Sequence, residues 1–177
     1  VISSLGLGDI VIRELINRNY DEDTILFTAF LLRQLFSLVI IIISGSIIFY
    51  FNSFSDLHSV ILSILLTQII FINFDVIDKY FQSKVKSKIS VRIILLSLII
   101  SSILRLLAVY LKAEVIWFAV LQTFENFLLC VGLLITFFAI HKKSFSFRFS
   151  KNLAKLFLKE SWVLVISSLM IILYMRV

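Results

Sequence analysis

Proline is absent from this chain of 177 residues, and cysteine, histidine and glycine are scarce. The one cysteine, Cys130, has no partner within the chain for a disulfide. With only His58 and His141, expected on opposite faces of the protein, a metal site is not expected either. None of the four glycines belongs to a phosphate-binding glycine-rich loop, so the sequence does not indicate ATP hydrolysis. We therefore predict no cofactor and no metal.

Charged residues are also few: they make up 16% of the chain, against 60% hydrophobic residues that include 18 phenylalanines. A mean hydropathy of +1.07 excludes a water-soluble domain, because such a domain could not bury so much apolar surface. A bilayer core of about 30 Å requires roughly 20 apolar residues of helix. The sequence predicts an all-α, polytopic transmembrane helical bundle with spans at Ile25–Phe51, Leu57–Phe81, Val91–Leu111 and Val115–Ile140.

Both ends of the sequence are apolar. The chain opens without methionine on VISSLGLGDIVI and stops at Val177 within another apolar run. No basic segment followed by a short apolar core and a cleavage site begins the chain, so we expect that targeting information is absent or was removed. We interpret the sequence as the middle of a longer protein.

The net charge of +6 is distributed unevenly among the connecting segments. Asn52–Asp56 and Lys112–Glu114 contain one lysine between them, whereas Lys79–Arg92 and Lys142–Lys159 are strongly basic. Short basic segments mark the cytosolic side of a membrane protein. The basic segments are therefore predicted to face the cytosol, and this asymmetry explains the charge better than binding to nucleic acid does.

The segment after the fourth span has the pattern of an amphipathic helix in the membrane interface. Three lysines recur every four residues, and apolar residues gather on the opposite side. The lysines are Lys151, Lys155 and Lys159, and the apolar residues are Leu153, Leu156 and Phe157. We expect the lysines to lie against anionic headgroups, as an anchor or as a specific lipid site, before Ser161 and Trp162 turn the chain into the next span.

Charged residues within the spans are candidates for function, because each costs several kcal/mol unless it faces a partner or water. Glu125 is about 15 Å into its helix, near the midplane. Arg105 lies on the preceding antiparallel helix, and an Arg105–Glu125 pair would be either structural or part of a polar path. Arg33 is weaker evidence, since its long helix could shift or tilt and let the guanidinium reach the cytosolic interface.

A polar ridge is predicted near the cytosolic end of the second span. Asp75 and Asp78 are three residues apart, and Lys79 and Gln82 follow on the same side of the helix. One interpretation is self-neutralisation, with Asp75 paired to Lys79 and Asp78 bonded to Gln82. The other is a cytosolic gate or ion-coupling site, since two carboxylates just inside the hydrocarbon suit a proton or cation relay.

Several stretches of the chain carry a resemblance to one family: GLGDIVIREL at Gly6–Leu15, FDVIDKYFQSKVKSK at Phe74–Lys88, LQTFEN at Leu121–Asn126, LFLKESWVL at Leu156–Leu164 and YMR at Tyr174–Arg176. Together they resemble the bacterial O-antigen flippases of the multidrug, oligosaccharidyl-lipid and polysaccharide exporter superfamily. The resemblance extends over the whole chain.

The resemblance implies a partial chain of a MATE-like fold, from the end of the second transmembrane helix to the start of the seventh. Residues 1–141 would belong to the N-terminal six-helix bundle, residues 142–160 would form a cytosolic amphipathic linker, and residues 161–177 would begin the second bundle. Relatives commonly have proline where this chain has Val163, so the kink that such a proline would cause is left open.

The resemblance implies a transporter of the bacterial inner membrane that is not an enzyme. It would flip an undecaprenyl-diphosphate-linked oligosaccharide from the cytosolic to the periplasmic leaflet for surface polysaccharide synthesis, by rocking of two bundles. The implied partners are this substrate, membrane lipids and the polysaccharide polymerase machinery, with H⁺ or Na⁺ as the candidate coupling ion. Nucleic acid is not an expected partner.

Arginine side chains bind phosphate in a bidentate manner, so a cationic cavity would suit the diphosphate. Under the resemblance, the candidate contacts along the substrate path are Arg13, Arg33, Arg105, Glu125 and Arg176. Arg13 has the alternative of pairing with Glu14 or of anchoring its helix at the interface.

Two other function classes compete with the flippase. A cation-coupled multidrug or metabolite exporter of the same superfamily would use the same fold. A membrane-embedded enzyme would require polar groups in the outer loops, which contain only Asp56, His58, Lys112 and Glu114. These residues form no nucleophile, base or metal constellation, so an enzyme is the least favoured class.

Overall fold

The computed structural model describes residues 7–17, 20–51, 57–140 and 146–176, which form helices and their connections and contain no strand. The elements in chain order are α1 (Leu7–Asn17), α2 (Glu22–Phe51), α3 (Leu57–Ile72), the 3₁₀ turn η1 (Asn73–Asp75), α4 (Val76–Ser83), α5 (Ser87–Tyr110), α6 (Val115–Ile140) and α7 (Lys151–Arg176). The prediction of an all-α fold is confirmed.

Among the described residues, four stretches are long and apolar enough to cross a membrane: Glu22–Ile48, Leu57–Ser83, Ser87–Tyr110 and Val115–Ile140. Each overlaps the span predicted for it, and the bounds differ by only a few residues. This pattern is the one expected of a multi-pass membrane protein.

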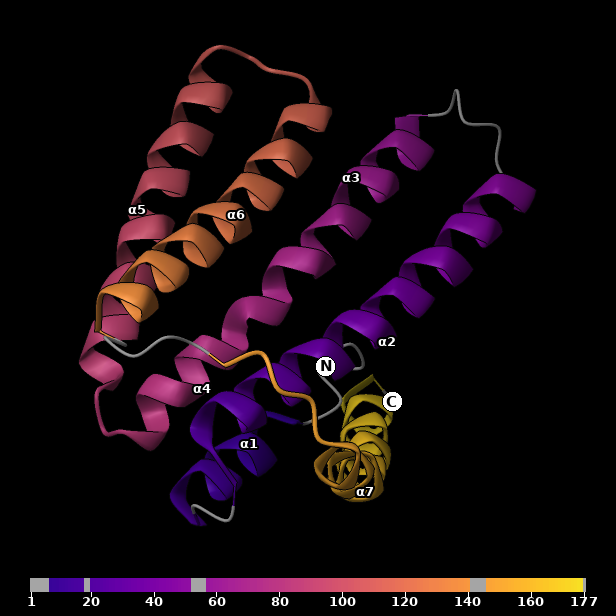
Figure 1. Cartoon of the computed structure of the whole chain (residues 1–177). Coiled ribbons are helices and arrows are strands. Elements are labelled where there is room, and N and C mark those ends of the chain that lie inside the picture. The colour runs from indigo at the N-terminus through magenta and orange to yellow at the C-terminus, as the bar shows by residue number, and fades with distance from the viewer. Residues whose placement is uncertain (1–6, 18–19, 52–56, 141–145, 177) are drawn as a thin grey trace.

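The spanning helices form two antiparallel pairs (Figure 1). Helix α6 packs against both α3 and α5, and α3 also contacts α2. The α4–α5 and α5–α6 turns each contain a residue with a positive φ, Val85 at 57° and Lys112 at 52°. Both turns reverse the chain without glycine, although a branched side chain such as that of Val85 is strained in this region.

The second span is not the continuous helix that the sequence predicted. A 3₁₀ turn at Asn73–Asp75 separates α3 from α4. Asn73 is buried, and its side-chain amide donates to the hydroxyl of Ser37 at 2.8 Å and to the side chain of Gln34, both on α2. A polar side chain held by a neighbouring helix in this way accounts for a local break, because 3₁₀ turns inside helices mark such strained positions.

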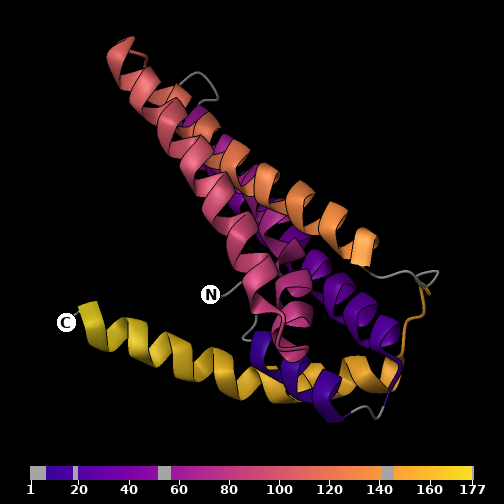
Figure 2. The ribbon, with the colours of Figure 1, turned by 90° about the vertical axis from the view of Figure 1, so that its left-hand side faces the viewer.

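The best-packed part of the molecule lies at the end of the bundle that is predicted to face the cytosol. Its buried side chains come from the start of α2, from α4, from the end of α6, and from α1 and α7, which cross below the bundle (Figure 2). Further toward the outer end, the spans expose many large apolar side chains, which is expected of surfaces that face lipid or other helices.

Helix α7 corrects the prediction of a turn at Ser161 and Trp162. The helix runs unbroken from Lys151 to Arg176, and the Ser161 hydroxyl donates to the carbonyl of Phe157 at 2.5 Å within it. The expected apolar side is also placed differently: Leu153 and Phe157 are fully buried in the protein core instead of facing lipid. They are buried because α1 and α2 pack against α7.

Candidate functional site

The most buried charge among the described residues is the guanidinium of Arg33 on α2. Arg33 is 2% exposed, and its Nη1 lies 3.6 Å from a carboxylate oxygen of Asp75 in η1. Its Nε has no hydrogen-bond partner in the described part of the protein. The 3₁₀ turn presents Asp75 to α2, and the guanidinium of Arg33 lies inside the protein, roughly 16 Å along the helix from the start of α2.

Asp75 begins a chain of polar contacts along α4. Its carboxylate lies 3.9 Å from Lys79 Nζ, and Lys79 Nζ lies 3.7 Å from the carboxylate of Asp78. The Gln82 amide then donates to Asp78 at 2.7 Å. Both pairings of the self-neutralised ridge are therefore present. With Arg33, these residues form what we name the cytosolic charge cluster: Arg33, Asp75, Asp78, Lys79 and Gln82.

Two cations and two carboxylates give the cytosolic charge cluster no net charge. The ion-pair distances of 3.6 to 3.9 Å are long for charge-assisted hydrogen bonds. Asp75 remains accessible, since its side chain is 40% exposed, whereas that of Arg33 is 2% exposed. The cluster thus combines long ion pairs and one accessible carboxylate with a short hydrogen bond from Gln82 to Asp78.

Helix α1 closes the cytosolic charge cluster on one side at Gly8. A Cβ atom at this position would lie 3.1 Å from Cε of Lys79 and 3.7 Å from Nη2 of Arg33. The glycine therefore permits a close approach of α1 to both cations of the cluster. Sequence reasoning did not detect this contact, because Gly8 and Lys79 are far apart in the chain.

A second polar group joins α5 to α6, deeper in the bundle. Arg105 Nη2 donates to a carboxylate oxygen of Glu125 at 2.6 Å and to the Gln122 side-chain oxygen at 2.8 Å. The Ser101 hydroxyl donates to the same oxygen of Glu125 at 2.6 Å. The geometric possibility that Arg105 and Glu125 pair is thus realised. We name Ser101, Arg105, Gln122 and Glu125 the α5–α6 polar cluster.

The same side of α6 also bonds to α3. The Asn126 amide donates to the side chain of Gln68 at 3.2 Å, and the Thr123 hydroxyl donates to the carbonyl of Ile64 at 3.3 Å. Sequence reasoning concentrated on charges and missed the amides of Gln68, Asn73 and Asn126. The sequence signal for these residues is an amide side chain within an apolar run, because such an amide must find a hydrogen-bond partner inside the bundle.

The other candidate arginines lie elsewhere. Arg13 on α1 pairs with Glu14 at 3.2 Å and with Glu160 on α7, so it is an interhelical tie at the protein surface. The hydrogen bond to Glu160 is the main cause that raises the pKa of Arg13 above its usual value. Arg176 belongs to α7, but its side chain lies outside the described residues. Of the arginines predicted to share one substrate path, the three whose side chains are described occupy separate contacts: Arg13, Arg33 and Arg105.

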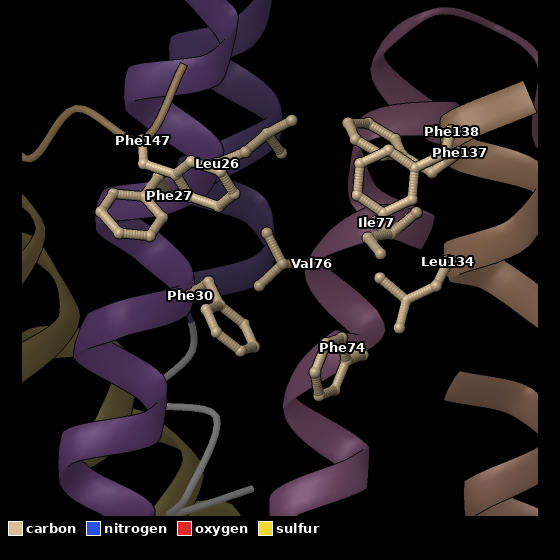
Figure 3. A pocket seen from close by; sticks show the side chains of 10 residues that line it. All are labelled: Leu26, Phe27, Phe30, Phe74, Val76, Ile77, Leu134, Phe137, Phe138 and Phe147. Atoms are coloured by element: carbon tan, nitrogen blue, oxygen red, sulfur yellow. The ribbon is translucent and has the colours of Figure 1, made fainter. Parts of the chain in front are cut away.

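A purely apolar pocket lies on the other side of α4 (Figure 3). It is lined by side chains of α2, of η1 and α4, of α6 and of the segment before α7, and contains no polar group: Leu26, Phe27, Phe30, Phe74, Val76, Ile77, Leu134, Phe137, Phe138 and Phe147. The volume of this cavity is small, about 140 Å³. The 3₁₀ turn and α4 thus separate a charged side from an aromatic one.

Protein-family models, curated proteins and solved structures yield no match to the chain. Within the described residues, no group of three or more His, Cys, Asp or Glu side chains could hold a metal ion. The functional interpretation therefore depends on the two polar clusters and on the resemblance of the sequence stretches.

Proposed function

We propose that this chain is part of a flippase of the bacterial inner membrane with a MATE-like fold. It moves an undecaprenyl-diphosphate-linked oligosaccharide from the cytosolic to the periplasmic leaflet for surface polysaccharide synthesis. The observation that carries the proposal is the buried guanidinium of Arg33, which has a free Nε and only a distant carboxylate partner. A buried cation at membrane depth is a functional feature by default.

The chemistry of the cytosolic charge cluster supports an anionic substrate. A diphosphate offers Arg33 and Lys79 more oxygen acceptors than Asp75 does, so it competes with Asp75 for both cations. This exchange loosens the link between α2 and η1, which Asp75 otherwise maintains. Substrate binding is thereby coupled to the packing of α1, α2 and α4, because α2, η1 and α4 supply the cluster residues and α1 packs against two of them at Gly8.

Deletion of the gene tests the proposal in the cell. The deletion strain is expected to lose surface polysaccharide and to accumulate lipid-linked sugar in the cytosolic leaflet. The wild-type gene and Arg92→Gln restore the polysaccharide, since Arg92 is an exposed arginine of α5 outside both clusters. Arg33→Gln does not restore it, at equal amounts of protein in the membrane. Normal surface polysaccharide in the deletion strain contradicts the proposal.

A cation-coupled exporter of the same superfamily is the second candidate. It is favoured by the two neighbouring carboxylates of Asp75 and Asp78, which lie 3.9 and 3.7 Å from Lys79 Nζ, because paired carboxylates near the end of a span suit a proton or cation relay. Here the deletion strain keeps its polysaccharide and becomes sensitive to toxic compounds. Replacing Asp75 and Asp78 by their amides then abolishes the proton or sodium dependence of export.

A further inference from the structure

A hollow at the cytosolic end of the molecule belongs to neither polar cluster. It lies between α1 and the first turns of α7 and has a volume of about 700 Å³. Its polar lining consists of Arg13, Asn152, Lys155, Lys159 and Glu160. Ile10 and Leu156 supply the apolar part. The residues of α7 in this lining are spaced three and four apart and therefore share one side of the helix.

The position of α7 is fixed from its other side. Leu153 and Phe157 are fully buried in the core, so α7 cannot rotate without exposing them. The pair of Arg13 and Glu160 ties α7 to α1 across the hollow. Lys155 and Lys159 are thus held toward the hollow by packing, while Lys151, one turn earlier, is exposed and does not line it.

The charges of the hollow suit a phosphate group. Three cations, Arg13, Lys155 and Lys159, face one carboxylate, that of Glu160. The side chain of Arg13 is 52% exposed, and its guanidinium has further N–H donors beyond those that bind Glu14 and Glu160. The Asn152 amide adds a neutral donor or acceptor. Ammonium and guanidinium groups around an open space are the usual partners of phosphate oxygens.

The surroundings indicate that the phosphate belongs to a lipid. Leu158 and Trp162 are exposed beside the hollow, at 41% and 68%, and Trp162 follows Lys159 by three residues on the same side of α7. Exposed tryptophan and leucine next to lysines are typical of a helix at the headgroup level of a membrane. The basic segments that flank the spans place this end of the molecule on the cytosolic side.

We propose that the hollow between α1 and α7 binds the phosphate headgroup of an anionic phospholipid of the cytosolic leaflet. The lipid phosphate takes Lys155 and Lys159 as its main partners and competes with Glu160 for Arg13. Binding then adds a lipid contact to the link between α1 and α7. This inference does not depend on the transported substrate, since it concerns a surface outside the cytosolic charge cluster.

Native mass spectrometry of the full-length protein in detergent tests the inference, with phosphatidylglycerol and phosphatidylcholine as probes. Phosphatidylglycerol is expected to bind preferentially. Lys155→Ala and Lys159→Ala each weaken its binding by about fivefold, the effect of one lysine at an anionic surface. The matched control, Lys151→Ala, removes the same charge from the same helix and leaves binding unchanged. Glu160→Gln strengthens binding, because Arg13 loses one of its two carboxylate partners and keeps only Glu14.

Three results would overturn the inference. Equal weakening by Lys151→Ala would show that α7 attracts anionic lipid only through its general charge. Equal binding of both lipids would show that the hollow does not recognise the net negative charge of the headgroup. Binding of inorganic phosphate with the same dependence on Lys155 and Lys159, and without any lipid preference, would assign the hollow to a soluble anion. Unchanged thermal unfolding of each variant establishes that the fold is retained.

Discussion

Arg105 and Glu125 form an ion pair between α5 and α6, with 2.6 Å between the guanidinium nitrogen and the carboxylate oxygen. The Ser101 hydroxyl bonds to the same oxygen, so one carboxylate oxygen gathers two donors from α5. Within an apolar bundle, removing one partner of such a pair is costly, because the other charge is left without a partner. Replacing both partners by apolar residues costs less.

Arg105→Leu is expected to destabilise the protein by about 3 kcal/mol, because Glu125 keeps its charge without a cation. Glu125→Gln costs less, since an amide still accepts from Ser101. The double variant Arg105→Leu/Glu125→Leu should be more stable than Arg105→Leu alone. Unfolding in detergent, analysed as a double-mutant cycle, measures these differences. If the stability losses of the two single variants simply add up in the double variant, Arg105 and Glu125 are not coupled. If the double variant still transports substrate, the role of the pair is structural.

Asp75 is the carboxylate partner of the buried Arg33, so Asp75→Asn is expected to reduce the free energy of unfolding by about 2 kcal/mol. The loss is smaller than the loss of a fully buried partner would be, because the side chain of Asp75 is partly exposed. The matched control is Asp9→Asn, which removes an exposed carboxylate from α1. Adding Arg33→Gln to Asp75→Asn should recover stability without recovering transport. Recovery of both would mean that the cytosolic charge cluster serves only the fold.

Gly132 permits the close approach of α5 and α6. A Cβ atom there would lie 2.6 Å from a methyl group of Ile93, so Gly132→Ala should cost about 1 to 3 kcal/mol through overpacking. Gly45, in the middle of α2, has no atom within 4 Å of such a Cβ. Gly45→Ala should therefore stabilise the protein by up to about 1 kcal/mol, through helix propensity alone. Thermal unfolding measures the stability of both variants. Equal changes in stability for Gly132→Ala and Gly45→Ala would refute the close contact of α5 and α6 at Gly132.

The orientation of the chain can be tested by labelling single cysteines in a Cys130→Ser background. A membrane-impermeant maleimide should label Tyr110→Cys in intact cells, because this exposed residue ends α5 on the outer side. Lys86→Cys, in the turn between α4 and α5, should react only after the membrane is permeabilised. The opposite pattern would invert the orientation and place the cytosolic charge cluster on the outer side.

The number and position of the spans could be predicted from the sequence, because hydrophobic length alone decides them. The pairing of Arg105 with Glu125 was accessible as a possibility, since the short turn at Lys112 makes their helices antiparallel neighbours. The pairs of Asp75 with Lys79 and of Asp78 with Gln82 followed from spacing along one helix.

The burial of Arg33 could not be predicted in the same way. It depends on the 3₁₀ turn at Asn73–Asp75 and on the approach of α1 at Gly8, and both are tertiary contacts without a local sequence signal. The continuous course of α7 past Ser161 has no local signal either, because a change from an amphipathic to an apolar pattern is compatible with a break in the helix as well as with one continuous helix. Charge patterns located the polar residues, but not their partners on other helices.

Flipping by the purified full-length protein tests the central claim most directly. In proteoliposomes with lipid-linked oligosaccharide in both leaflets, a membrane-impermeant glycosidase added outside digests the outer pool, and digestion of the inner pool then reports flipping. The account predicts complete digestion with wild-type protein and with Arg92→Gln, and digestion of only the outer pool with Arg33→Gln. Digestion by the wild-type protein at the rate of protein-free liposomes would contradict it.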